Sequence, residues 1–175
     1  MQVELVGYPS ERDLMWMKEC AIGTMGKDVK TKPSSEWIHR MLKARHSPIR
    51  ELNYRFVIRD IPYWVSTHLV RHHIGIMCYV QSQRNDRQSN YDRNAARQDA
   101  PVTMRISLNA ESLMVIANKR LCAQAAKETR ETVMQMCALA IKATPELEGL
   151  LVPMCDYCGG VCHEMQPCGK RGKAQ

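Results

Sequence analysis

The stretch of sequence that decides the fold is residues 68–84, His-Leu-Val-Arg-His-His-Ile-Gly-Ile-Met-Cys-Tyr-Val-Gln-Ser-Gln-Arg. Its first part predicts two turns of a helix that ends near Gly75, and the apolar run 76–80 predicts a strand directly after it. The stretch also contains more polar side chains than a packing element needs. These are His68, Arg71, His72, His73, Gln81, Ser82, Gln83 and Arg84. Such a donor set suits a phosphorylated or otherwise anionic ligand.

Working outward, the arginine content points the same way. Residues 44–118 contain ten arginines and no lysine. Lysine would solubilise a surface equally well, so this bias favours planar, bidentate recognition of phosphate or carboxylate, although drift in composition is the plain alternative. Nucleic acid is an unlikely partner, because the segment lacks the interleaved aromatic residues of a single-strand binder and has no finger or helix-turn-helix pattern.

Length and composition favour one globular domain. The chain has 175 residues and 45% hydrophobic residues, enough for a substantial core. We expect a single domain over residues 1–175, with a cysteine-rich tail at about 153–175. No apolar run reaches the ~20 residues of a membrane span, and residues 1–6 do not read as a signal peptide. We therefore expect a cytoplasmic protein without a membrane, whose eight cysteines are free thiols or ligands.

Hydrophobic periodicity and capping residues predict an α/β (α+β) chain. Strands are expected at 2–6, 51–59, 76–80 and 101–108, and a polar loop or irregular helix at 85–100. Asp60 is expected to cap the helix that leads to His68, with Pro62 in its first turn. Helices are also expected from Glu11 to about Gly23, after Ser34 and Ser35, and from Asn109 through one long stretch towards Pro145.

Arg120 occupies an unusual position in this pattern. It shares the apolar face of its predicted helix with Leu113, Ile116 and Leu121. A buried guanidinium group needs a partner, and either a structural carboxylate or an anionic ligand would serve. His68 and His72 likewise continue an apolar stripe. They could be hydrogen-bonded core histidines, and a metal pair would lack an adjacent third ligand.

The tail has the pattern Cys155-x2-Cys158-x3-Cys162-His163-x4-Cys168. These spacings permit a zinc site, but the only C-x2-C pair is followed by an irregular second pair. We therefore expect free thiols and no bound metal, with structural zinc as the alternative.

At this point four stretches resemble the flavin-dependent thymidylate synthase family in the right order. Arg71-His72-His73 followed by Gln81-Ser82-Gln83-Arg84 resembles the family's Arg-His-Arg-x7-Ser signature, and His68 stands where the family has Gln. His46-Ser47-Pro48 and Ala96-Arg97-x3-Pro101 resemble two further motifs. The helical motif is resembled by Asn109-Ala110-x-x-Leu113, Arg120-Leu121-Cys122-x2-Ala125 and Glu128-x-Arg130-Glu131. The similarity covers roughly residues 14–155.

The resemblance implies a curved, largely antiparallel sheet flanked by helices, in a homotetramer whose active sites lie between subunits. It implies reductive methylation of dUMP to dTMP with FAD, NADPH and 5,10-methylenetetrahydrofolate, and no enzyme nucleophile. The residues implied to bind FAD are Arg71, His72, His73 and Asn109. Those implied to bind substrate are His68, Arg71, Ser82, Gln83, Arg84, Arg97 and Arg120, of which Arg120 is also the catalytic residue.

Three departures from the family pattern keep other functions open. His73 stands where the family has Arg, and Val80 stands where it has Glu. Eight residues rather than seven separate His73 from Ser82, which predicts a one-residue bulge. One alternative is an enzyme that modifies another pyrimidine nucleotide on the same scaffold, for example by hydroxymethylation. The other, motivated by the arginines and the cysteine-rich tail, is a zinc-containing nucleic-acid-binding module.

Overall fold

A computed structural model describes residues 1–88, 91–170 and 172–173. Its main body alternates strands and helices, and its tail carries three short elements. In chain order the elements are β1 Gln2–Gly7, α1 Glu11–Gly23, α2 Ser35–Lys43, the 3-10 helix Ser47–Glu51, β2 Asn53–Pro62, α3 Tyr63–Val70, β3 Ile76–Val80, β4 Pro101–Asn109, α4 Ala110–Arg120, α5 Lys127–Ala143, the 3-10 helix Pro145–Leu147, α6 Met154–Tyr157, β5 Val161–Cys162 and β6 Gly172–Lys173.

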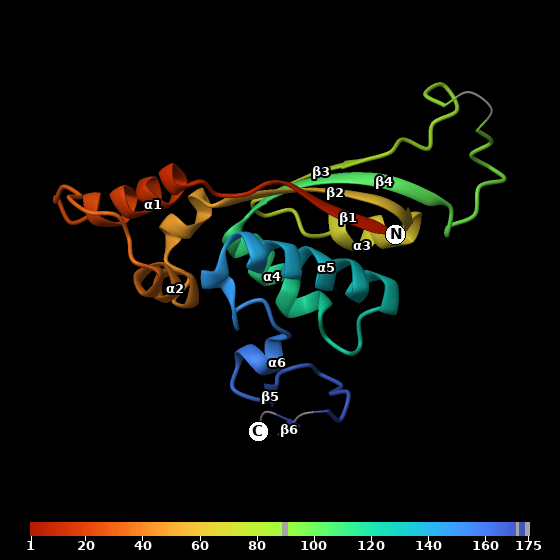
Figure 1. The fold of residues 1–175 in the computed structure, drawn as a ribbon. Helices are drawn as coiled ribbons and strands as arrows, with labels where there is room; N and C mark the ends of the chain where they lie inside the picture. The colour runs from red at the N-terminus through yellow and green to blue at the C-terminus, as the bar shows by residue number, and fades with distance from the viewer. Residues whose placement is uncertain (89–90, 171, 174–175) are drawn as a thin grey trace.

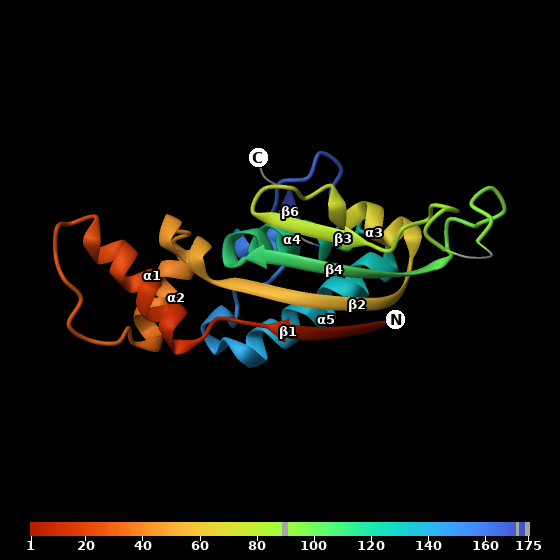
Figure 2. The same ribbon diagram turned by 90° about the horizontal axis from the view of Figure 1, so that it is seen from above.

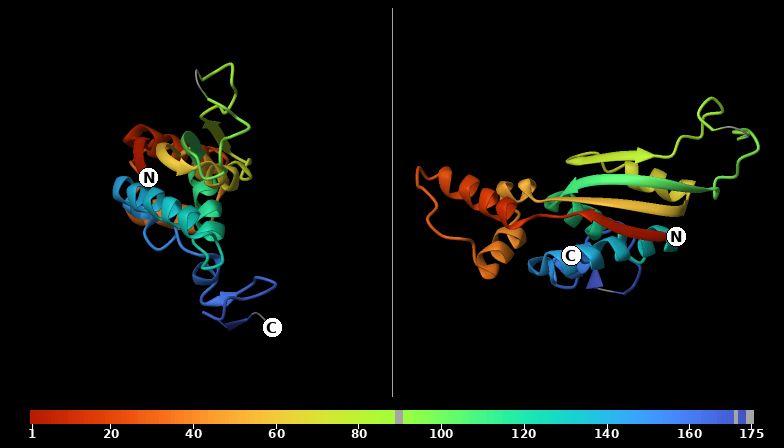
Figure 3. Two further views of the ribbon diagram at one scale, coloured as in Figure 1. Left: turned by 90° about the vertical axis from the view of Figure 1, so that its right-hand side faces the viewer. Right: turned by 45° about the horizontal axis from the view of Figure 1, so that its top comes forward.

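The main sheet has four antiparallel strands in the order β1-β2-β4-β3. It is curved and open, and α3, α4 and α5 cover one of its faces (Figure 1). The other face carries no helix in the described part of the chain (Figure 3), and α1 and α2 extend from one end of the sheet (Figure 2). The expected α/β fold with a curved antiparallel sheet is confirmed.

The core lies between the sheet and the helices. Alternate residues of β2 and β4 point into it, as the period-two pattern predicts. The largest fully buried side chains of these strands are Tyr54, Phe56, Ile58, Ile61, Met104, Ile106 and Leu108. The Tyr54 hydroxyl, far from solvent, lies 3.0 Å from the Thr144 hydroxyl. Because these apolar side chains are buried against the helices, the opposite face of the sheet is the one left uncovered.

The uncovered face exposes large side chains. Met77 and Tyr79 on β3 are 62% and 64% exposed, and Val6 on β1 is 53% exposed. Tyr79 pairs in register with the exposed Arg105 of β4. A sheet face that shows apolar and aromatic side chains next to arginine has the composition of a contact surface.

Two sequence predictions about helices are wrong. Asp60 does not cap α3. It lies within β2 at a positive φ of 56°, where the β2–β4 register shifts between Ile58 and Ile61. The helix begins after Pro62, whose fixed φ suits that place. An acidic residue two positions before a proline resembles a helix start, but here it lies in a β-bulge.

The long helical stretch from Asn109 is two helices. Asn109 does cap α4, but α4 ends at Arg120 and α5 begins at Lys127. The turn between them is held by a hydrogen bond from Ala125 N–H to Cys122 O. The Arg130 guanidinium also donates hydrogen bonds to two carbonyl groups of the turn. Residues 121–126 contain neither Gly nor Pro, so the sequence gives no local sign of this break.

The tail is attached to the body through Arg45. Its guanidinium lies 4.5 Å from the Tyr157 ring centre, and its Nε donates to the Tyr157 hydroxyl at 3.2 Å. It also donates to Asn118 of α4, which is 2% exposed and in turn donates to Val152 O at 2.8 Å. Arg45 has a positive φ of 53°, which the ring contact and these hydrogen bonds offset.

No helix in the described residues is long and apolar enough to cross a membrane.

Candidate functional site

The turn after α3 places the signature residues. The helix ends at Val70 with Arg71 as its C-cap. His72 and His73 therefore lie in the turn after the helix, and the sequence prediction that placed them within the helix is wrong. His72 N donates to Leu69 O at 3.1 Å, and the chain then reverses at Gly75, whose φ is +69°. Only glycine adopts this conformation readily. The reversal brings the turn against the start of α4.

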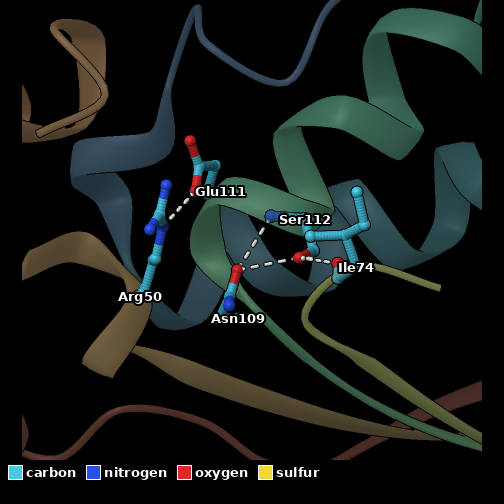
Figure 4. A network of polar contacts seen from close by, with 5 residues as sticks. All are labelled: Arg50, Ile74, Asn109, Glu111 and Ser112. Carbon is cyan, nitrogen blue, oxygen red and sulfur yellow. Dashed lines mark hydrogen bonds and ion pairs between the residues drawn. The ribbon is translucent and has the colours of Figure 1, made fainter. Parts of the chain in front are cut away.

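A polar network joins this turn to α4 (Figure 4). Asn109 Oδ1 accepts the backbone N–H of Ser112 at 2.9 Å, and the Ser112 hydroxyl lies 2.8 Å from Ile74 O. A Cβ on Gly75 would lie 2.5 Å from Asn109 Nδ2 and from Ser112 Oγ. Glycine at this position is therefore needed for both its φ and its lack of a side chain. The Asn109 oxygen is a helix cap here.

Arg120 is held without a carboxylate. Its Nε donates to His72 Nε2 at 3.0 Å, and its Nη2 donates to His68 O at 2.9 Å. No ion pair between described residues includes Arg120. Burial, followed by the charge of Arg71, lowers the pKa of Arg120 below its ordinary value. The sequence allowed either a structural carboxylate or an anionic ligand as the partner of Arg120. Among the described residues, no carboxylate pairs with it.

His72 accepts from Arg120, so its Nε2 must carry no proton. Burial, then the charge of Arg120 and the neighbouring His73, lower the pKa of His72 to about 4. The imidazole is thus neutral near pH 7. His68 also has a lowered pKa, mainly through burial and then through Arg120 and Arg71. Its Nδ1 lies 2.9 Å from the Thr129 hydroxyl, and its ring meets the edge of Trp64.

Two hollows meet at His72. One, of about 370 Å³, is lined by Arg50, Arg71, His72, His73, Glu111 and Ser112 among others. The other, of about 280 Å³, is lined by His72, Lys119, Arg120, Gln124 and Glu164 among others. The side chain of His68 lines neither. We call the set His68, Arg71, His72, His73, Asn109 and Arg120 the histidine cluster. The structure brings Arg120 into contact with His72 and with the His68 backbone, and Arg71 and His73 belong to the same turn. Asn109 lies at the opposite end of α4 from Arg120 and meets this turn at Gly75.

The other predicted residues lie elsewhere. Ser82, Gln83, Arg84 and Arg97 belong to the segment between β3 and β4, which we call the distal loop (residues 81–88 and 91–100). Residues 82–84 follow the opposite end of β3 from Gly75, and five strand residues at ~3.3 Å each make that separation roughly 17 Å. Figure 2 shows the loop extending beyond the sheet. Arg97, at the other end of the loop, lines a hollow with Trp64, whose ring centroid is 5.3 Å from that of His68. Within one chain, residues 82–84 therefore lie apart from the turn after α3.

Two of the four arginines in the distal loop, Arg84 and Arg97, already have local partners. Arg84 donates to both carboxylate oxygens of Asp86, at 2.8 and 2.7 Å. Arg97 does the same with Asp99, at 2.8 and 3.0 Å, which lowers the pKa of the Asp99 carboxyl. All four side chains are exposed. The pairs are weak in water, so an anion can replace the carboxylates.

The prediction of a one-residue bulge before Ser82 is wrong for β3, which contains no bulge. β3 pairs with β4 in an unbroken register from Ile76 opposite Leu108 to Val80 opposite Met104. The extra residue is therefore taken up outside β3, in the turns at its ends.

Sequence reasoning did not single out Arg50, Lys119 or Glu164. Arg50 donates to Glu111 at 2.5 Å across the first hollow, and Lys119 pairs with Glu164 at 3.3 Å beside the second. These pairs join residues that are 61 and 45 positions apart. Complementary charges at such a distance leave no periodic signal in the sequence.

No protein-family model matches the chain, and no curated protein does. Solved structures do. Thymidylate synthase X (ThyX) from Helicobacter pylori, solved with FAD and dUMP, is similar in two structures. They have TM-scores of 0.68 and 0.69 and identities of 17% and 16%, and each match covers 86% of this chain and 99% of the other.

The UMP/dUMP methylase PolB from Streptomyces cacaoi, bound with 5-Br dUMP, is also similar. Its TM-score is 0.66 at 17% identity, and the match covers 83% of this chain and 92% of that one. The chain therefore has the fold of the flavin-dependent thymidylate synthases.

Proposed function

We propose that the chain is a flavin-dependent enzyme that methylates a pyrimidine nucleotide. The reaction we assign converts dUMP, 5,10-methylenetetrahydrofolate, NADPH and a proton to dTMP, tetrahydrofolate and NADP⁺. The observation that carries the proposal is Arg120, a charged guanidinium without a carboxylate, oriented by a neutral His72 at the wall of a hollow. The shared fold supports this enzyme over a nucleic-acid-binding module.

The residues of the first hollow suit FAD. Arg71 and His73 are exposed at its rim and can donate to the phosphates of a dinucleotide, and His72 lies at its inner end. Asn109 Nδ2 lies beside Gly75 at the start of α4 and is the amide donor that we assign to the cofactor. FAD, when bound, supplies the reducing equivalents, and the protein supplies binding and orientation.

The distal loop suits the nucleotide phosphate. Ser82 presents a hydroxyl, Gln83 an amide, and Arg84 and Arg97 exposed guanidinium groups. Since residues 82–84 lie roughly 17 Å from the turn after α3 along β3, we assign the two halves of one site to different copies in a homotetramer. The exposed Met77 and Tyr79 on the uncovered sheet face support contact between copies.

Arg120 would act on the uracil ring. The carbonyl of His68 and the imidazole of His72 fix two of its N–H groups, so the remaining donors can point towards a ligand in the hollow. There they would stabilise the negative charge that develops on the ring as its C5 attacks the methylene carbon. This scheme needs no enzyme nucleophile, so none of the eight cysteines has a catalytic role.

A different pyrimidine nucleotide is the second candidate. The similar PolB is described as a UMP/dUMP methylase, so this fold serves more than one nucleotide. Val80, at the end of β3, also stands where the family has an acidic residue. The His68 ring nitrogen Nδ1 lies beside the Thr129 hydroxyl. For His68 to bind substrate as proposed, its ring must turn away from Thr129 when the tetramer forms.

The test is to purify the chain, add FAD, and record its absorbance and its mass by light scattering. We expect a yellow tetramer that produces dTMP from dUMP. Product analysis with UMP and dCMP separates the two enzymes, and rescue of a thymidine-requiring bacterial strain tests the reaction in cells. A colourless monomer that never takes up flavin would contradict the proposal.

A further inference from the structure

The first hollow contains a charged pair that is additional to the flavin-binding residues proposed so far. Arg50 and Glu111 both line this hollow, together with Arg71 and His73. Arg50 Nε donates to Glu111 Oε2 at 2.5 Å, and Figure 4 shows the two side chains pointing toward each other. Among the described lining residues, Glu111 is the one carboxylate. The hollow therefore contains a guanidinium group that a carboxylate orients.

The backbone holds this pair in place. Arg50 belongs to the 3-10 helix that precedes β2, and its neighbour Ile49 is fully buried. Leu52, directly after that helix, accepts a hydrogen bond from Ala110 N–H at 2.8 Å, and Glu111 is the next residue of α4. A backbone hydrogen bond thus joins the two segments beside the ion pair. Because the guanidinium is already ordered, a ligand that binds it loses less free energy to the ordering of side chains.

Arg50 keeps most of its donors unused. A guanidinium group has five N–H donors in a planar fork. Only Nε of Arg50 is engaged, and its two Nη groups donate no hydrogen bond to any described residue. The Arg50 side chain is 57% exposed, so a ligand in the hollow can reach it. A planar fork with unused donors matches the oxygen atoms of a phosphate group.

The same hollow also presents apolar surface. Ile74 is 82% exposed and Val115 is 40% exposed, and Ile76 lines the hollow beside them. Such side chains lose contact with water when a flat ring covers them, which favours binding of an aromatic ligand. A hollow that offers apolar side chains together with guanidinium groups therefore suits a ligand that has both an aromatic ring and phosphates.

We propose that Arg50 binds the phosphates of the flavin cofactor and makes the hollow selective for phosphorylated flavins over riboflavin. Glu111 is its positioning residue, which holds Nε and leaves the Nη groups for the ligand. This inference rests on the proposed function, because it takes the ligand of the hollow to be a flavin. Arg50 and Arg71 together provide two positive charges for a diphosphate, against the one negative charge of Glu111.

The test compares flavins that differ in their phosphates. The full chain is titrated with FAD, FMN and riboflavin, and the dissociation constants are measured by calorimetry at one salt concentration. Arg50→Gln should lose roughly 10–100-fold in affinity for FAD and FMN. It should keep the affinity of the wild type for riboflavin, which also shows that the variant is folded. A loss with FAD but none with FMN would place Arg50 against the adenosine and overturn the proposal.

A double variant separates the lost donors from a simpler charge effect. Arg50→Gln leaves Glu111 unpaired, and that negative charge would by itself repel phosphates. Arg50→Gln combined with Glu111→Gln removes this charge. The double variant should still bind FAD at least about tenfold more weakly than Glu111→Gln alone. Equal affinities of these two proteins would overturn the proposal.

The positioning role of Glu111 has its own test. Glu111→Gln keeps an oxygen that can accept from Arg50, whereas Glu111→Ala does not, and both lack the negative charge. Glu111→Ala should therefore bind FAD about fivefold more weakly than Glu111→Gln, with equal affinity for riboflavin. Equal affinities for FAD would show that Glu111 does not position Arg50.

Arg12→Gln is the matched control. Arg12 pairs with Glu19 on α1 at 2.9 Å with similar exposure of the two side chains, and it does not line the hollow. It should bind FAD as the wild type does. A loss as large as that of Arg50→Gln would show an effect of net charge alone and overturn the proposal.

The outcome for the wild type separates this inference from the proposed function. A wild type that binds none of the three flavins would overturn the proposed function and this inference with it. A wild type that binds FAD, with Arg50→Gln binding it equally well, would overturn only the role of Arg50.

Discussion

Arg120 in the histidine cluster and Arg84 in the distal loop are held in opposite ways. Arg120 is half-buried and donates to a carbonyl and a neutral imidazole, so its charge is left without a counterion. Arg84 is exposed and its charge is matched by Asp86, two residues away. A buried charge that the protein leaves unmatched is prepared for a ligand, whereas an exposed pair can exchange its partner at little cost.

The largest expected effect is on catalysis, from Arg120→Lys. Lysine keeps a charge but loses the planar fork that His68 O and His72 orient. Turnover should fall by roughly 10²–10³-fold, the scale of one preorganised donor. Flavin binding and melting temperature should change little, because no carboxylate among the described residues depends on Arg120. The measurement is the single-turnover rate per folded molecule.

Arg59→Lys is the matched control, since Arg59 pairs with Glu4 on the edge of the sheet at 2.8 Å. It should leave turnover unchanged. Normal turnover in Arg120→Lys would remove Arg120 from the site and end the contrast with Arg84. A large drop in melting temperature with unchanged turnover would show a structural role instead.

The next effect is on stability, from Gly75→Ala. The new Cβ would meet Asn109 Nδ2 and Ser112 Oγ at 2.5 Å and would sit at a φ of +69°. We expect a loss of about 1–3 kcal/mol in the free energy of unfolding, together with weaker flavin binding. Gly149→Ala is the control, because Gly149 has a φ of +74° in open space. Equal losses in urea unfolding would show that the contact with Asn109 and Ser112 is not important.

The smallest effect is a pH dependence from His72. Its folded pKa of about 4 lies below the ordinary 6.5. The unfolded chain therefore binds the proton first, so stability from His72 is complete above about pH 6.5 and is lost as the pH falls towards 4. His72→Gln should flatten this part of the stability curve, measured by urea unfolding at several pH values. A curve identical to that of the wild type would mean that the pKa of His72 is the same in the folded and the unfolded chain.

The sequence predicted the four strands of the main sheet and the helix starts near Glu11, Ser34 and Asn109, because these depend on local capping and period-two burial. The sequence prediction failed where contacts between residues distant in the chain determine the local structure. The break after Arg120 is closed by Arg130, which no local residue announces.

The site was predicted in a similar way. The resemblance identified the histidine cluster and the distal loop as one site, and the structure separates them, because a sequence motif does not say which chain supplies each part. Arg50 and Glu164 were missed, since their partners lie far away in the chain.

The most direct test of the account is complementation between two inactive chains. One carries Arg120→Lys and the other carries Arg84→Ala with Arg97→Ala. If the two regions meet only between copies, oligomers assembled from an equal mixture should contain intact sites and recover roughly a quarter of wild-type turnover. Activity no greater than the sum of the two separate variants would contradict the assignment of one site to different chains.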